Sequence, residues 1–268
     1  MTTMDLIEGV SSQSLGQVFR AELRRLLRQG GLRRACLLAL GLSVLLGVMT
    51  LLLIDQISGG QADDGTAVTV PVETTASMAG IILGIAVTLH YGRLIQDGGV
   101  GTALALVPRR ARLFSAQFLA TGVVAAATAT LAGGVTTLVA VAATGTNGLG
   151  AALMAVAAGG IACALLAATA QATAYLVGGP VPALLTLVGW WIALPLALAA
   201  GSQFVAAPAS QALTTFADWT PISIQIRATN AGLQAGEVQD LLLNLGALFA
   251  LAAALGWISV AALNRRDF

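Results

Sequence analysis

Six long stretches of the chain are almost purely apolar, and each is long enough to cross a lipid bilayer. A helix of about 20 apolar residues spans a hydrocarbon core roughly 30 Å thick. Charged residues make up only 9% of the 268 residues, too few to cover the surface of a soluble domain of this length. The runs are too long and too uniform for the alternating strands of a membrane β-barrel. The sequence therefore predicts an all-α integral membrane protein.

We predict one membrane-spanning helix for each apolar run, with boundaries good to a few residues. The six spans are Ala35–Ile54, Ala76–Ile95, Phe114–Ala143, Leu149–Val177, Pro182–Ala200 and Leu241–Leu263. Pro195 predicts a kink in the fifth of these spans.

The charges are distributed unevenly between the two sides of this predicted bundle. All 13 basic residues are Arg, and every one except Arg227 falls on a single side when the N-terminus is placed inside. The opposite loops are acidic, including Asp63, Asp64 and Glu73 in the loop 55–75. Positive charge favours the cytoplasmic side, so we expect both termini in the cytoplasm. The bias towards Arg, Ala and Gly is typical of GC-rich bacteria, which indicates a bacterial plasma membrane.

The chain divides into a cytoplasmic N-terminal segment, 1–34, and a six-helix transmembrane domain, 35–268. Within Ser14–Gly31, a capping box of Ser14 and Gln17 predicts a helix start. Leucines gather on one helix face and arginines on the other, as in a helix lying at the membrane interface, and Gly30–Gly31 would end it. Glu22 falls on the apolar face, where it either pairs with Arg25 or contacts another span or a partner protein.

A cytoplasmic loop, 98–117, joins the second and third spans and concentrates positive charge. Arg109, Arg110 and Arg112 crowd behind Pro108, which fits the first turn of a new helix. Two interpretations stay open at this point: the arginines anchor the loop to anionic headgroups, or they dock an acidic cytoplasmic partner through bidentate contacts. Just before the loop, Asp97 is four residues from Arg93, the spacing of a helical ion pair.

Residues for catalysis or metal binding are few. His90 is the only histidine, and Cys36 and Cys163 stand alone inside apolar runs, as small core residues do. The chain has no G-x-x-x-x-G-K-[ST] phosphate loop and no G-x-S-x-G nucleophile motif. We therefore expect no enzyme activity, no metal, no cofactor and no nucleic-acid partner for this chain. Gln171, Trp190 and Asn244 are the pathway candidates in the later spans, although such residues more often serve packing.

Three elements, taken in order along the chain, resemble a known family. "AELRR" lies in the Arg-rich entry helix, "LALVPRRARLFSAQFLA" follows the second span, and "NRRDF" follows the last. Together they resemble the permease subunits of type-two ABC exporters, which are common in actinobacteria. The resemblance covers nearly the whole chain, and it implies a partner ATPase that binds ATP and Mg and a second permease copy or homologue.

The resemblance also implies roles for particular residues. The ATPase would contact the entry helix and the loop 98–117, with Glu22, Arg24, Arg109, Arg110 and Arg112 as candidate contacts. The family often carries a Glu shortly before the glycine of this loop, whereas this chain has Asp97 closer in. The outer segment 201–240, with Trp219 and Pro221, would form short helices that cap the pathway.

Two other classes of protein remain as alternatives. A secondary transporter usually has ionisable residues at mid-membrane, which the predicted spans lack. A non-transporting component, such as an immunity or assembly subunit, is compatible with the same pattern. The cargo stays open among drugs, lipids, peptides and polysaccharides, and the apolar spans favour an apolar or amphipathic one.

Overall fold

The chain is an all-helical membrane protein, as predicted. A computed structural model describes residues 14–58, 64–107, 109–145, 149–233 and 238–265. Within these ranges, six helical segments are long and apolar enough to cross a membrane. They are α3 (Gly30–Ser58), α4 (Asp64–Gln96), α6 (Arg110–Thr144), α7 (Leu149–Val177), the composite α8 (Pro180–Val188), η1 (Gly189–Ala193) and α9 (Leu194–Ser202), and α12 (Val238–Arg265).

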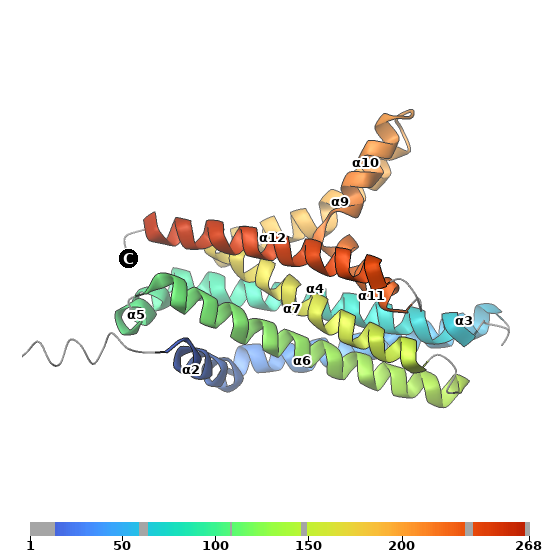
Figure 1. Cartoon of the computed structure of the whole chain (residues 1–268), viewed down its shortest axis with the longest axis horizontal. Helices are drawn as coiled ribbons and strands as arrows, with labels where there is room; N and C mark the ends of the chain where they lie inside the picture. The colour runs from blue at the N-terminus through green and yellow to red at the C-terminus, as the bar shows by residue number, and fades with distance from the viewer. Residues whose placement is uncertain (1–13, 59–63, 108, 146–148, 234–237, 266–268) are drawn as a thin grey trace, which may run out of the picture.

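The central helix of the bundle is α7, which packs against α4, α6, α8 and α12. Shorter helices complete the two ends: α2 (Leu15–Arg28) and α5 (Gly99–Leu106) at one end, and α11 (Pro221–Leu233) at the other (Figure 1). The C-terminal end of α12 lies at the same end as α2 and α5 (Figure 1). This end therefore carries the Arg-rich segments of the sequence.

The second span begins earlier than predicted. Residues 64–75 were expected in an outer loop, but they form the first turns of α4, with Pro71 inside the helix. Val68, Val72, Ala76 and Ala79 are buried, and their spacing of three or four residues places them on one helix face. The polar residues between them hid this face in the sequence. Asp63, the loop's other predicted acid, lies outside the described residues.

Glycines allow the central helices to approach one another closely. A Cβ added at Gly160 would lie 2.3 Å from Oγ1 of Thr130, and one at Gly84 would lie 2.3 Å from the Trp191 ring. A Cβ at Gly92 would lie 2.6 Å from Cα of Pro180, which is backbone and cannot rotate away. Small residues at helix contacts favour association in lipid, where apolar burial provides no drive.

The fifth span changes its helical geometry in the middle. The π-helical turn η1 lies directly before α9, whose first turn contains Pro195, the residue at which the sequence predicts a kink. Within this turn, Trp191 is buried in the bundle core. After the turn, α9 and α10 (Ala209–Asp218) pack on each other and project away from the other helices (Figure 1). Neither α9 nor α10 has a buried residue.

The predicted capping box at the start of α2 is confirmed. The Gln17 backbone N–H donates to Ser14 Oγ at 3.3 Å, and the Ser14 N–H donates to Gln17 Oε1 at 2.9 Å. The predicted end was wrong by two residues: Gln29 caps α2, and Gly30–Gly31 already begin α3. Part of the apolar face of α2 packs on α6 rather than facing away from the protein, because Val18 and Leu26 are buried against α6.

Candidate functional site

An ion pair lies where α2 meets the bundle. Both carboxylate oxygens of Glu22 accept hydrogen bonds from Nη1 of Arg25 at 3.3 Å, and Glu22 is only 8% exposed. Both interpretations of Glu22 from the sequence hold together: it pairs with Arg25 and it faces other spans. A buried charge is tolerated when it is paired and hydrogen-bonded, and Arg25 supplies this partner for Glu22.

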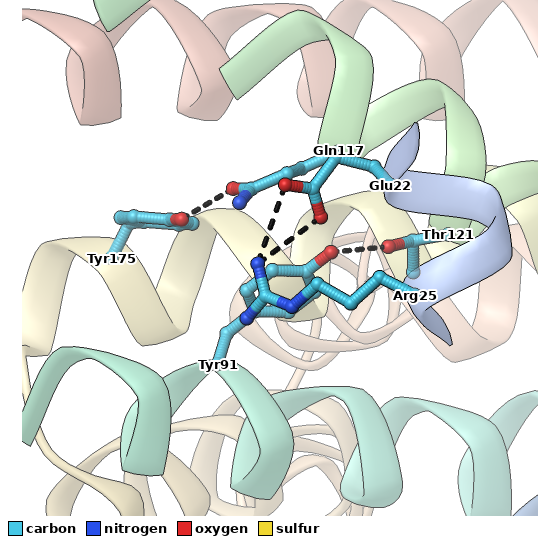
Figure 2. Close-up of polar contacts among 6 residues, drawn as sticks. All are labelled: Glu22, Arg25, Tyr91, Gln117, Thr121 and Tyr175. Atoms are coloured by element: carbon cyan, nitrogen blue, oxygen red, sulfur yellow. Dashed lines mark hydrogen bonds and ion pairs between the residues drawn. The ribbon is translucent and has the colours of Figure 1, made fainter. Parts of the chain in front are cut away.

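Beneath the ion pair, the two tyrosines of the chain form a polar floor (Figure 2). Tyr91 of α4 and Thr121 of α6 share a hydrogen bond of 2.8 Å between their hydroxyls. Tyr175 of α7 donates to Oε1 of Gln117 on α6. The tyrosine ring centroids are 5.7 Å apart, and both residues are buried. Three spanning helices and α2 therefore meet in one polar cluster.

Sequence reasoning missed this floor. Tyr91 and Tyr175 are 84 positions apart in sequence, and nothing in their immediate neighbours marks them as partners. One signal was present: each tyrosine lies within four residues of the predicted cytoplasmic end of its span. Two spans that end on the same side can bring such residues together, although only the packing decides which pairs meet.

A groove of about 870 Å³ opens beside the ion pair, between α2, the end of α4, α5 and the start of α6. Its lining is mainly apolar, with Glu22, Arg25, Gln17 and Thr102 as the polar members. The lining residues are Gln17, Val18, Ala21, Glu22, Arg25, Leu94, Gly99, Thr102, Ala103, Val107 and Leu113. The groove thus joins the two segments that the sequence singled out, the entry helix and the loop 98–117.

The predicted contact residues surround this end of the bundle but do not form one cluster. Arg24 is exposed on α2. Asp97 was expected on the same helix as Arg93, but α4 ends at Gln96 and Asp97 lies exposed in the turn that follows. Arg109 is the exposed N-cap of α6. Arg110 donates instead to the backbone carbonyl of Leu263 in α12. Pro108, predicted in a first helical turn, lies outside the described residues.

Arg112 is half-buried in the first turn of α6. Of the three clustered arginines, Arg109 therefore has the most exposed side chain, and Arg110 joins α6 to α12. Sequence spacing alone could not separate these roles, because Leu263 is 153 positions away from Arg110.

The predicted pathway residues lie on three different elements. Gln171 of α7 is fully buried, and neither atom of its amide has a hydrogen-bond partner within the described chain. Trp190 is half-buried in η1 and packs against the main core cluster. Asn244 lies on α12, beside a cavity of about 450 Å³ that Trp219, Arg227 and Asp240 also line. Their arrangement marks no single channel.

The α2 end of the bundle combines an apolar groove with a buried ion pair. In the described ranges, no three His, Cys, Asp or Glu residues are grouped so that they could hold a metal ion. The groove is lined mainly by apolar residues, with the Glu22–Arg25 pair on one side. Arg24 and Arg109 are exposed at the same end of the bundle. No protein-family model matches the chain, and no curated protein matches its sequence.

Proposed function

We propose that the chain is the transmembrane permease subunit of an ATP-driven ABC exporter in a bacterial plasma membrane. It forms the pathway with a second copy or a homologous permease, while separate cytoplasmic ATPase subunits bind ATP and Mg. The groove between α2 and α5 carries the proposal. A permease of this kind needs a receptor for its ATPase, and the groove joins the two segments that the resemblance assigns to that receptor.

The distribution of arginine supports the orientation. Four arginines lie at the end of the bundle where α2 and α5 lie (Figure 1). They are Arg33 at the start of α3, Arg93 at the end of α4, Arg109 at the start of α6 and Arg265 at the end of α12. Arg227 lies on α11, at the other end. By the positive-inside rule, the α2 end faces the cytoplasm, and α2 lies along the membrane interface with both termini inside.

The groove has the chemistry to receive a helix or loop of an acidic partner. Val18, Val107 and Leu113 provide apolar contact along its walls. Arg24 and Arg109 are exposed nearby and can bind carboxylates bidentately. Interfaces of this type combine an apolar centre with a polar rim, and charges at the rim steer the approach of the partner.

Motion at this groove would reach the core of the bundle. Helix α2 packs on α6, while α5 follows α4 after a short turn at Gly98, whose positive φ of 70° suits glycine. Both α4 and α6 pack directly on α7. A partner that pushes α2 and α5 thus acts on α6 and α4, two of the neighbours of the central helix. Such a push can rock the bundle between inward-open and outward-open states.

The projecting pair of helices supports an assembly with a second permease. Phe204 is 86% exposed and Phe216 is 68% exposed, and α9, the part of the fifth span that follows η1, has no buried residue. Exposed aromatic residues on a projecting element are typical of contact with another protein or with lipid. A neighbouring permease would cover this arm and complete the pathway.

Purification of the chain from its native membrane in mild detergent tests the proposal. We expect a stoichiometric subunit with a Walker phosphate loop to accompany the wild-type protein. Ala103→Trp fills the groove from α5 and should abolish this association. Arg109→Ala should weaken it about tenfold, the effect of losing one charge-assisted contact of roughly 1.4 kcal/mol.

Matched variants separate docking from general damage. Ala105→Trp places the same bulk on an exposed position of α5 outside the groove lining, and Arg34→Ala removes an exposed arginine of α3. Both should retain the partner. A wild-type chain that emerges without an ATPase, or an association that survives Ala103→Trp, would refute the proposal.

A further inference from the structure

A second groove, of about 350 Å³, lies between α2, α3 and α6. It is separate from the groove beside the ion pair, since the two share no lining residue. Leu23 and Leu27 of α2 form one wall, and Val123, Ala127 and Leu131 of α6 form another. The groove is therefore almost wholly apolar.

The groove opens to the outside of the bundle rather than to its core. Leu27 is 57% exposed and Leu131 is 60% exposed. Because α3 and α6 are spanning helices, these walls face the hydrocarbon of the bilayer near its boundary. In water such an apolar surface would be a liability, whereas in a membrane it is a place for an acyl chain.

The mouth of the groove is basic. Arg33, exposed on the first turn of α3, is the one charged residue among those that line it. Arg20, Arg24 and Arg28 are also exposed and follow one another at intervals of four along α2. Glu22, the acid of this helix, is turned into the bundle and paired with Arg25. An anionic group at the mouth therefore meets positive charge, and no carboxylate is among the described residues that line the groove.

We infer that this groove is a binding site for one anionic phospholipid of the leaflet on the α2 side. An acyl chain lies between Leu27 and Leu131, and the phosphate is bound by Arg33. An apolar chain suits these walls better than a peptide, whose backbone N–H and C=O groups would be left unpaired there. The basic mouth selects phosphatidylglycerol over phosphatidylcholine, whose choline group brings a positive charge. The site is independent of the proposed export function.

Native mass spectrometry of the protein, released from nanodiscs of equimolar phosphatidylglycerol and phosphatidylcholine, tests the inference. The wild-type chain should retain phosphatidylglycerol in roughly fivefold preference. Arg33→Gln should remove the preference, while total retained lipid falls little. Ala127→Phe should fill the groove and lower the retention of both lipids. Excess inorganic phosphate should displace neither, because the acyl chain contributes to binding.

Two matched controls accompany these variants. Arg34→Gln removes the adjacent exposed arginine, which does not line the groove, and Ala142→Phe adds the same bulk at an exposed position near the other end of α6. Both should bind lipid like the wild type. If Ala127→Phe fails to fold, Val123→Trp fills the groove from a side chain that is 47% exposed. Equal losses in Arg33→Gln and Arg34→Gln, or full retention in a folded groove-filling variant, would overturn the inference.

Discussion

The fourth and fifth spans are almost equally apolar, yet they have opposite places in the fold. In α7 the most apolar stretch has a mean hydropathy of 2.2 and is 61% buried within the chain. In the fifth span the values are 2.0 and 17%. Hydropathy identifies a segment that tolerates lipid, but it does not reveal whether lipid or protein surrounds it.

Side-chain size distinguishes the two spans. The buried positions of α7 are mostly Ala, with Gly, Thr and Cys163 among them, whereas the fifth span exposes Leu185, Leu194 and Leu196. Small residues let helices approach closely, and van der Waals contact then replaces the missing hydrophobic drive. Helix α7 is therefore packed against other helices along its length, whereas the fifth span is packed mainly through α8 and η1, its N-terminal half.

The largest expected effect concerns the residue that ties the fifth span to the bundle. Trp191 is 1% exposed and packs where Gly84 leaves room in α4. Trp191→Ala should lower the free energy of unfolding by about 3–5 kcal/mol, because it opens a cavity that the surroundings cannot fill. Unfolding of the purified protein by SDS titration in mixed micelles measures this.

Trp257→Ala is the matched control, since this side chain is 75% exposed on α12. It should change the free energy of unfolding by about 0.5 kcal/mol or less. Equal effects of the two substitutions would mean that the fifth span is held by contacts other than Trp191, and the contrast with α7 would need revision.

A smaller effect is expected where α4 passes the start of the fifth span. Alanine at Gly92 would place a Cβ 2.6 Å from Cα of Pro180, so one helix must shift. Gly92→Ala should therefore lower the free energy of unfolding by about 1–3 kcal/mol. At Gly246 of α12 a Cβ meets nothing within 4 Å, and Gly246→Ala should instead gain up to about 1 kcal/mol from helix propensity. The opposite signs make the test independent of any general response to alanine, and a stabilising Gly92→Ala would refute the close packing.

The sequence predicted more of the fold than of the site. Six spans and the capping box followed from apolar length and local chemistry, which act over a few residues. The early start of α4 was missed because polar residues hide the Val68 and Val72 face. The prediction of an outer segment with short helices corresponds to α10 and α11.

The candidate site depends on contacts that no local pattern encodes. Glu22 and Arg25 were recognisable because they are three residues apart, whereas Tyr91, Gln117 and Tyr175 come from three different spans. The rotation and depth of each helix decide such meetings. A single sequence gives these quantities only weakly, because a membrane helix with small residues on several sides offers more than one face to its neighbours.

Buried glutamines provide a test inside the tightly packed region itself. Gln225 of α11 donates to the Ala76 carbonyl at 2.8 Å and to Sγ of Cys163 at 3.2 Å, so Gln225→Leu should cost about 1–2 kcal/mol. Gln171 has no partner within the described chain, and Gln171→Leu should stabilise by about 1 kcal/mol because an unpaired amide leaves the core. The same SDS titration measures both. A destabilising Gln171→Leu would instead show that this amide is paired when the protein is in its membrane.

The smallest effect is expected at the polar floor, where α6 and α7 meet beneath α2. Tyr175→Phe removes the donor to Gln117 and leaves a buried acceptor unpaired, which should cost about 1 kcal/mol. Gln117→Leu should cost a similar amount, since it removes the acceptor of the same buried hydrogen bond. The double variant should cost less than the sum, because the donor and the acceptor of this one hydrogen bond are then both gone. Additive costs in this double-mutant cycle would mean that the two side chains do not interact. The end of α7 at the floor would then be held by contacts other than this hydrogen bond.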